Sequence, residues 1–378
     1  MTSEPRTERR LRVLHLILML GETNSQYNEH CLPTMGERDL TIVTYFEPRL
    51  TPPPQISLFA GDGTVRGFLR ALRAALDVGR YDVIHGHAPE SAAMLIFALV
   101  VWGRLRRLRP SLVYTVHDSF YDYSLRNQAL MLVTLRAFSR VVFCSRAAYD
   151  SFPRLWRWLV RDRWRVVQNG ADYDRVDRVL ATSPSSSRER FTVVTVGRLE
   201  RVKDPVVALE AFAAGAEPDD LLVFIGAGAL TSKLEDRARE LGLHDRLELT
   251  GLVPRDEVFR RCAAADLFVS TSRGEGLPVA VMEVMATACP VVLSDIPPHR
   301  ELLGGAEDVA PLVATGDVRG FASQIRRFRA MTDGERVEAG RRGRQHVLDG
   351  FSLSRMHAGY ERVYREVARP RPSATRVP

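Results

Sequence analysis

The sequence predicts an α/β protein built from two doubly wound domains, and three observations support this fold class. Its 378 residues exceed what one hydrophobic core ordinarily serves and suit two domains of roughly 150 to 200 residues each. Short runs rich in Val, Ile and Leu alternate with longer amphipathic stretches, as parallel strands covered by crossover helices do. A polar, Ser- and Pro-rich stretch at 182–187 separates the two halves.

Each half of the chain has five predicted strands, and their positions define the expected domains. Those of the first half lie at 11–18, 40–45, 81–86, 111–116 and 141–144, and those of the second at 191–196, 221–225, 246–250, 267–270 and 290–293. We expect a first domain over 1–180, a second over 181–351, a final helix over 352–370 that packs back toward the first domain, and a disordered tail over 371–378.

Ligands of open α/β sheets bind outside the carboxyl ends of the strands. Two such sheets that face one another therefore predict a central cleft. The residues that directly follow predicted strands are the first candidates for function.

Composition narrows the class of protein further. The formal charge of +7 comes almost wholly from arginine, because the chain has only two lysines, Lys203 and Lys233. Such a surplus suits a phosphorylated substrate, nucleic acid or an anionic membrane face. The four cysteines are far apart and form no CxxC or Cys/His cluster, which favours reduced thiols in a cytoplasmic protein. The apolar run 91–103 falls short of the roughly 20 residues that span a bilayer, and no secretory signal pattern is found.

One candidate segment follows the strand at 191–196. Gly197 supplies a turn, Arg198 comes next, and Lys203 follows five residues later, ahead of an amphipathic stretch. The two cations could converge on a single diphosphate at the edge of the sheet. A solvated loop is the alternative interpretation for an isolated Arg/Lys pair.

A second segment places two carboxylates, Glu275 and Glu283, around a predicted helix start at Pro278. The backbone N–H groups of Gly276 and Leu277 would then point from a helix N-terminus, which favours anions. Glu283 lies among apolar neighbours, where an isolated carboxylate is costly unless it is paired. The two glutamates could flank one elongated ligand, although either one alone would be read as a surface acid.

Taken with their order along the chain, these segments resemble the retaining, glycogen-synthase-like glycosyltransferases of family 4, which have the GT-B fold. The strongest matches are VGRLERVKDP and SRGEGLPVAVMEVMATACPVVLSDIPPHRELL, followed by FIGAGAL, LELTGLVPRDEV and CAAADLFVSTS, and more weakly YTVHDSF, VFCSRAA and VVQNGAD. The resemblance implies a GT-B architecture of two Rossmann-like domains facing a central cleft, with the acceptor side in the first and the donor side in the second.

The resemblance also implies which residues bind the donor phosphates. Arg198 and Lys203 would hold the diphosphate, together with the backbone at Gly276 and Leu277. Many members carry a Gly-Gly turn in the first loop, whereas this chain has GETNSQYNEHCLP there. Gly21 can supply one glycine of close approach, and the acid that follows it would repel a diphosphate unless it turns away.

Further roles implied by the resemblance concern the sugar and the base. Glu275 would contact the transferred sugar, and Glu283 would accept hydrogen bonds from the ribose hydroxyls. Leu252 and Val253 would lie beside the base, and His117, which follows the strand at 111–116, would reach the transferred sugar. His117 and Glu275 are thus the candidate catalytic residues. For the neighbouring HGH sequence at 85–87 the sequence favours a structural role.

The resemblance predicts no metal and no other cofactor. Asp172-Tyr173-Asp174 spells the DxD of metal-dependent transferases, but it lies in the predicted linker. In this superfamily Arg and Lys neutralise the leaving diphosphate.

The sequence thus predicts transfer of a hexosyl group from a nucleoside-diphosphate sugar (UDP- or GDP-sugar) to an acceptor hydroxyl, with retention, in glycan, glycolipid or cell-envelope polysaccharide biosynthesis. A related-fold epimerase or phosphorylase is the nearest alternative. A dinucleotide-dependent oxidoreductase is a weaker one, suggested by Gly226-Ala227-Gly228 after a strand and Glu248 further on.

A peripheral membrane contact is compatible with this activity, since a lipid-linked acceptor would require it. Residues 151–167 combine three tryptophans with five arginines, a composition that suits an anionic bilayer interface. A helix packed on the first sheet is the alternative. Nucleic acid is not an expected partner, because no known binding module is found.

Overall fold

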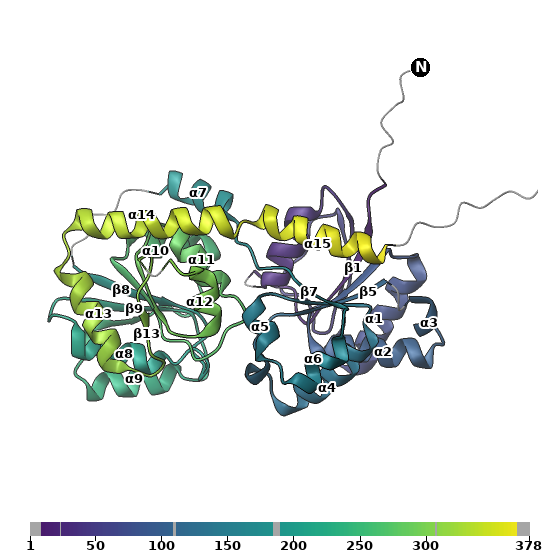
Figure 1. The fold of residues 1–378 in the computed structure, drawn as a ribbon, viewed down its shortest axis with the longest axis horizontal. Coiled ribbons are helices and arrows are strands. Elements are labelled where there is room, and N and C mark those ends of the chain that lie inside the picture. The colour runs from purple at the N-terminus through teal and green to yellow at the C-terminus, as the bar shows by residue number, and fades with distance from the viewer. Residues whose placement is uncertain (1–8, 23, 109–110, 184–189, 307, 369–378) are drawn as a thin grey trace, which may run out of the picture.

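The computed structural model describes residues 9–22, 24–108, 111–183, 190–306 and 308–368. Two parallel sheets lie side by side, each with helices against both faces (Figure 1). The predicted fold class is therefore confirmed. The predicted tail at 371–378 lies outside the described residues.

The first sheet has seven strands in the order β3-β2-β1-β4-β5-β6-β7, and every pairing is parallel. Its strands are β1 (Arg12–Ile17), β2 (Asp39–Thr44), β3 (Ile56–Phe59), β4 (Val83–Gly86), β5 (Leu112–Val116), β6 (Arg140–Phe143) and β7 (Trp164–Val166). Around it lie the π-helix η1 (Gln26–Cys31), the short helices η2 (Leu32–Thr34) and η4 (Phe120–Asp122), and α1 (Val65–Val78), α2 (Pro89–Val101), α3 (Leu105–Leu108), α4 (Leu125–Ala137), α5 (Arg146–Ser151) and α6 (Arg154–Val160). The next helix, α7 (Tyr173–Ala181), lies against the second domain (Figure 1).

The second sheet has six parallel strands in the order β10-β9-β8-β11-β12-β13. They are β8 (Thr192–Val196), β9 (Leu221–Ile225), β10 (Leu247–Leu249), β11 (Leu267–Ser270), β12 (Val291–Ser294) and β13 (Leu312–Val313). The helices that follow its strands are α8 (Pro205–Gly215), α9 (Thr231–Glu240), η5 (His244–Arg246), α10 (Arg255–Ala264), α11 (Val279–Ala286), α12 (Pro297–Leu303), α13 (Val318–Ala330), α14 (Asp333–Gly350) and α15 (Leu353–Val367).

All ten predicted strands are present, and three further strands are not in the prediction. β3 and β13 are short strands at sheet edges, and β7 lies inside the Arg/Trp-rich segment 151–167. That segment is divided: its first part forms α6, and its last part pairs with β6. Short edge strands carry too few residues to show a clear period.

The chain crosses between the domains twice, and the two crossings are bound to one another. Ala171 donates its N–H to the carbonyl of Phe351 at 3.0 Å, and Leu353 donates to the carbonyl of Ala171 at 3.3 Å. Gly170 makes this approach possible, because a Cβ there would lie 2.3 Å from the carbonyl oxygen of Ser352. The two crossing segments are therefore hydrogen-bonded to each other at the place where the two domains meet.

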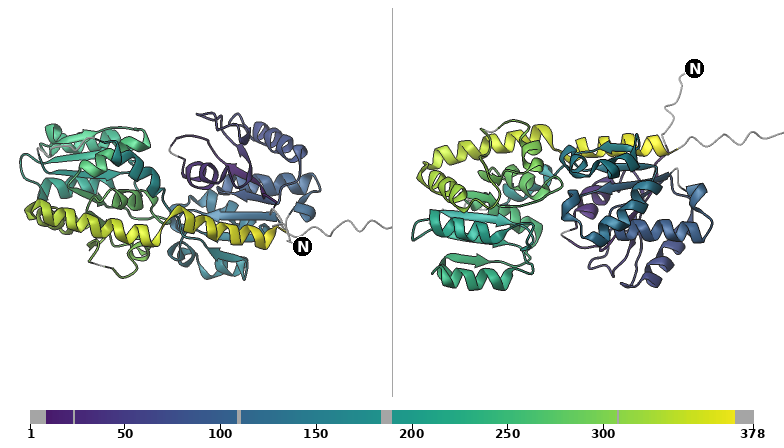
Figure 2. Two further views of the ribbon diagram at one scale, coloured as in Figure 1. Left: turned by 90° about the horizontal axis from the view of Figure 1, so that it is seen from above. Right: turned by 60° about the horizontal axis from the view of Figure 1, so that its bottom comes forward.

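The last two helices run across both domains, α14 along the second and α15 along the first (Figure 2). The apolar stripe of α15, including Met356, Tyr360 and Val363, is buried against Val13 and Val113 on one face of the first sheet. Each such fully buried side chain stabilises the fold by about 1.5–3 kcal/mol. Residues of β1, β4 and β5 that share this face therefore lie beneath α15.

Candidate active site at the domain junction

The site lies where the loop before α11 meets the ends of β5 and β6. Three successive carbonyls of that loop accept hydrogen bonds from the first domain: that of Glu275 from Ser119 Oγ at 2.6 Å, that of Gly276 from Ser145 Oγ at 2.7 Å, and that of Leu277 from Asn169 Nδ2 at 3.0 Å. With the carbonyls facing the first domain, the N–H groups of Gly276 and Leu277 donate no hydrogen bond within the described residues. These two N–H groups remain available to an anion at the helix start.

Gly276 occupies the tightest point of this junction. A Cβ there would lie 1.7 Å from the carbonyl oxygen of His117 and 2.8 Å from the sulfur of Cys144. Any side chain would push the domains apart, so the glycine is needed for the close approach itself.

Lys203 and Glu275 form an ion pair at this place. Lys203 Nζ lies 2.5 Å from Glu275 Oε1, and both side chains are largely buried. Burial acts to raise the pKa of the Glu275 carboxyl, but the charges of Lys203 and His299 outweigh it and lower the pKa overall. Glu275 is thus held ionised, as an acceptor of hydrogen bonds.

Arg198 is exposed and contributes its charge to the same site. Burial and then the charge of Glu275 raise the pKa of Asp118, while Arg198 and Lys203 act to lower it. The structure therefore brings Lys203 and Glu275 into contact, and Arg198 acts on Asp118, a residue that the sequence analysis did not single out.

Glu283 lies on the buried face of α11, and Arg255 binds it. Arg255 Nε donates to Glu283 Oε1 at 2.8 Å, and its Nη2 lies 3.3 Å from Glu29 of η1, in the other domain. Burial raises the pKa of Glu283, while Arg255 acts to lower it. For Glu29, burial and the nearby Glu283 outweigh Arg255 and raise the pKa to about 8. Glu283, the residue predicted to bind the ribose, is therefore bound to Arg255 in this structure.

His117 follows β5 and is partly exposed at the junction. Its Nε2 lies 3.0 Å from His87 Nδ1, and desolvation lowers the pKa of its imidazole to about 4. His117 is therefore neutral near pH 7 and cannot serve as a cation toward the phosphates.

Comparison with known proteins assigns the chain to a family. Residues 181–346 match the family described as Glycosyl transferases group 1, and residues 32–175 match Glycosyltransferase Family 4. The chain is a glycosyltransferase of this family.

Individual relatives agree with this assignment. The glycosyltransferase is 23% identical over 311 residues, 75% of each chain, to the UDP-Gal:alpha-D-GlcNAc-diphosphoundecaprenol alpha-1,3-galactosyltransferase of Escherichia coli. Its fold is similar to that of sucrose-phosphate synthase from Thermosynechococcus elongatus, with TM-score 0.77, 18% identity and coverage of 95% and 99% of the two chains. It is also similar to Anabaena HepE in complex with UDP and glucose, with TM-score 0.73, 17% identity and coverage of 94% and 99%. The GT-B architecture is thus shown.

The remaining predicted residues of the glycosyltransferase lie in the loops before α10 and before η1. Leu252 is 68% exposed and Val253 is half-buried, both just before α10 and its Arg255. Gly21 is buried in the loop after β1, where the carbonyl of Glu22 accepts a hydrogen bond from Asn28 Nδ2 at 2.7 Å. The loop thereby folds onto its own backbone and leads into η1.

Two patterns that suggested other chemistry have structural explanations in this transferase. Asp172 of the DxD sequence is the N-cap of α7 and accepts the N–H of Arg175 at 2.9 Å. The glycines of the GxG sequence allow close backbone contact, since Cβ atoms at Gly226 and Gly228 would lie 2.0 Å from the carbonyl oxygen of Gly197 and 2.4 Å from that of Leu199. These contacts give Asp172 and the two glycines structural roles.

Several site residues of the transferase could not be found from sequence alone. Ser119, Ser145 and Asn169 lie in the segments that resemble the family, but their roles arise from contacts across the junction. A cavity of about 1380 Å³ beside α15 is lined by His357, Glu361 and the DxD sequence at 172–174, among other residues, and none of them is a predicted donor-binding residue. It lies away from the ion pair of Lys203 and Glu275, and we do not assign the donor to it.

Proposed function

We propose that this glycosyltransferase moves a hexosyl group from a nucleoside-diphosphate sugar, a UDP- or GDP-sugar, to an acceptor hydroxyl with retention of configuration. The observation that carries the proposal is the position of Lys203, which pairs with Glu275 directly before the N–H groups of Gly276 and Leu277, while Arg198 is near enough to lower the pKa of Asp118 at the same site. Two cations and two unpaired donors at a helix start suit a diphosphate. The E. coli relative is named for a UDP-sugar, and HepE was solved with UDP.

In the proposed reaction the bond between the anomeric carbon and the diphosphate breaks as the acceptor oxygen approaches from the same face. The leaving phosphate oxygen takes the acceptor proton, so no basic side chain is needed at that step. Arg198, Lys203 and the α11 N-terminus stabilise the charge that develops on the diphosphate. Because Lys203 and Arg198 supply this positive charge, the proposal includes no metal or other cofactor.

Glu275 and Glu283 position the donor in this proposal. The ionised Glu275 accepts hydrogen bonds from hydroxyls of the hexose, with His117 on the other side of the sugar. Glu283 accepts from the ribose after Arg255 turns aside or shares it. Leu252 and Val253 flank the base. The protein then contributes orientation and electrostatics.

We further propose a lipid-linked acceptor and a contact with an anionic membrane, in glycolipid or cell-envelope polysaccharide biosynthesis at the cytoplasmic face. The E. coli relative is named for a diphosphoundecaprenol acceptor. No helix among the described residues is both long and apolar enough to cross a bilayer. A surface contact is therefore the form of attachment that we propose.

The surface that would make this contact lies on α2, α4 and α6 of the first domain. We call it the apolar patch: Phe97, Val100, Val101, Leu125, Leu132, Val133, Leu155 and Trp158, whose side chains are 44% to 83% exposed. The guanidinium of Arg161 lies 5.0 Å from the centre of the Trp158 ring. Of the three tryptophans in 151–167, Trp158 is the exposed one, because Trp156 packs on Phe120 and Trp164 on Tyr149.

The decisive experiment for the function is a donor screen followed by product analysis. UDP- and GDP-sugars are compared by thermal shift, since a bound ligand stabilises in proportion to the logarithm of its saturation. The stabilising donor is then incubated with acceptor lipids, and the anomeric configuration of the product is read by NMR. An inverted product, or free epimerised sugar in place of a glycoside, would overturn the proposal.

A further inference from the structure

Five histidines gather beneath α15, on one face of the first sheet. His15 and His85 are register partners on β1 and β4, His87 follows β4, and His30 lies in η1. These four are at most 6% exposed. His117 ends the group at the domain junction, where its side chain is partly exposed.

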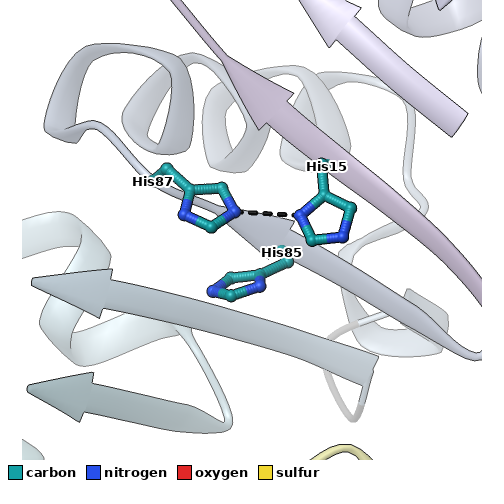
Figure 3. Close-up of side chains that lie close together, drawn as sticks. All are labelled: His15, His85 and His87. Carbon is teal, nitrogen blue, oxygen red and sulfur yellow. Dashed lines mark hydrogen bonds between the residues drawn. The ribbon is translucent and has the colours of Figure 1, made fainter. Parts of the chain in front are cut away.

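Three of these rings form a hydrogen-bonded line, which we call the histidine row: His15, His87 and His117. His15 Nδ1 lies 2.9 Å from His87 Nε2, the link drawn in Figure 3, and His87 Nδ1 lies 3.0 Å from His117 Nε2. The ring centres are 5.2 and 5.3 Å apart and the planes differ by 17° and 25°. With these N···N distances, the bonded nitrogens must lie on the line between the ring centres, which is the best geometry for sharing a proton.

A metal ion fits this geometry less well. Two overlapping sets of three histidines from the group have nitrogen atoms within 4.8 Å of one another, a spacing at which a metal ion could be bound. An ion would need nitrogens that converge on one point at about 2.0 Å each, whereas the row's nitrogens face each other directly. Both nitrogens of His85 are engaged already, by Tyr364 OH and by Thr115 Oγ1, each at 2.7 Å.

The buried end of the row, at His15, decides which way its hydrogen bonds run, and Arg38 lies in the same buried region. Arg38 is 5% exposed, binds Glu361 at 2.9 Å and lies over the ring of Tyr364 at 5.0 Å. Burial first, and the positive charge of Arg38 second, lower the pKa of His15 to about 3, so the ring is neutral. His15 Nε2 is fully buried and has no partner among the described residues. A buried N–H without an acceptor is rarer in proteins than a buried acceptor atom without a donor, so this nitrogen is the bare one and the proton of His15 lies on Nδ1.

The remaining protons follow from this end of the row. His15 donates from Nδ1 to His87 Nε2, so His87 carries its proton on Nδ1 and donates to His117 Nε2. His117 then carries its proton on Nδ1, which has no hydrogen-bond partner among the described residues. Because His117 is the row's partly exposed member, this N–H is the one open to a ligand.

We propose that His15 and His87 are positioning residues that hold His117 as the Nδ1–H tautomer, so that it donates a hydrogen bond to an oxygen of the transferred sugar. The sugar as ligand rests on the proposed function, whereas the tautomer does not. In this state His117 Nε2 is occupied, and His117 acts as a neutral donor without taking up the acceptor proton.

The tautomer is tested on the ligand-free full chain by nitrogen-15 NMR of the histidine rings. The His117 signals are assigned by their loss in His117→Gln. In the wild type, Nδ1 of His117 is expected to be the protonated nitrogen and Nε2 the bare one. His87→Leu removes the hydrogen bond to His117 Nε2, so that His117 can exchange between its two tautomers. The two nitrogen signals of His117 are then expected to move toward each other. His85→Gln, which alters the same sheet face outside the row, is the matched control and should leave them in place.

A protonated Nε2 on His117 in the wild type would overturn the proposal, as would signals unchanged in a folded His87→Leu. One equivalent of Zn²⁺ is expected to leave the signals of the histidine row in place. If Zn²⁺ instead shifts the signals of all three histidines and the shift saturates, the proposal is overturned as well. Kinetically, His87→Leu is expected to lower kcat by about tenfold, the loss of one neutral hydrogen bond, with little change in KM for the donor. If the wild type turns over no nucleotide sugar, the proposed function fails, while the NMR result still decides the tautomer.

Discussion

At the scale of single residues, Lys203 has two roles in the proposed reaction. It binds the diphosphate, and its ammonium pairs with Glu275, the proposed hexose-binding residue, beside the start of α11. Lys203→Ala is expected to reduce kcat/KM for the donor by about 10- to 100-fold, since a hydrogen bond to a charged group contributes about 1.5–3 kcal/mol. Steady-state kinetics measure this effect. Lys233→Ala, the other lysine of the chain, is the control and should turn over at the wild-type rate. Equal rates for both variants would contradict the assignment.

Gly276 supports a second prediction at this scale. A methyl group there meets backbone atoms of His117, which cannot move aside as a flexible side chain can. Gly276→Ala is expected to cost about 1–3 kcal/mol in the free energy of unfolding, as overpacking does, and to lose most activity.

Denaturant unfolding provides the measurement for this glycine, with Gly334→Ala as its control. Gly334 lies in the first turn of α14 with nothing within 4 Å of a Cβ. Alanine there should leave stability unchanged or raise it by about 0.5–1 kcal/mol. A Gly276→Ala variant as stable and active as the wild type would show that the domains do not meet as described.

At the scale of elements, η1 of the first domain is tied to α10 and α11 of the second through Arg255. One guanidinium serves two buried carboxylates, closer to Glu283 than to Glu29, so Glu29 is the one that holds a proton. Its pKa is raised from 4.5 to about 8. A group with a raised pKa stabilises the folded state fully below its unfolded value, and this stabilisation is lost as the pH rises through the folded value.

The wild type is therefore expected to lose stability between pH 4.5 and about 8 through Glu29, by up to about 1.4 kcal/mol per pH unit. Glu29→Gln imitates the protonated form and should show a smaller fall over that range. Melting temperatures at pH 6 and pH 8 measure the difference, with Glu37→Gln as the exposed control. A fall in Glu29→Gln as large as in the wild type would contradict the raised pKa.

The elements also show which parts of this structure the sequence could predict. The period of apolar residues identified ten strands, because a buried parallel strand must be apolar on both faces. It missed β7, whose Trp164-Arg165-Val166 is half-buried and reads equally as part of a helix. Among the site residues, Lys203 and Glu275 follow strands and were singled out. Arg255 and Asn169 were not, because their partners are distant in sequence and meet them only across the junction.

At the scale of the whole molecule, the proposed donor site and the proposed membrane contact lie on different sides of the first domain. The junction is held by the ends of β5 and β6, while the apolar patch lies on α2, α4 and α6, along the lower side of that domain in Figure 1. A lipid-linked acceptor would have to reach the junction from the bilayer along this domain.

The membrane contact gives the last prediction, because the patch should bind bilayers by its apolar side chains and by the charge around them. Leu155 and Trp158 are 68% and 58% exposed, and burying each in an interface contributes about 1.5–3 kcal/mol. The double variant Leu155→Ser/Trp158→Ser is expected to reduce co-sedimentation with anionic vesicles by at least about tenfold at unchanged melting temperature. Arg154→Gln/Arg161→Gln should weaken it by less and flatten its dependence on salt.

Val337→Ser is the matched control for this contact, since Val337 is 58% exposed on α14 of the second domain and its loss should leave co-sedimentation unchanged. Neutral vesicles should bind the wild type more weakly than anionic ones, because the charge around the patch then has no partner. Equal binding by the wild type and both double variants would remove the patch as the contact surface. The acceptor would then have to reach the junction without the bilayer being held against α4 and α6.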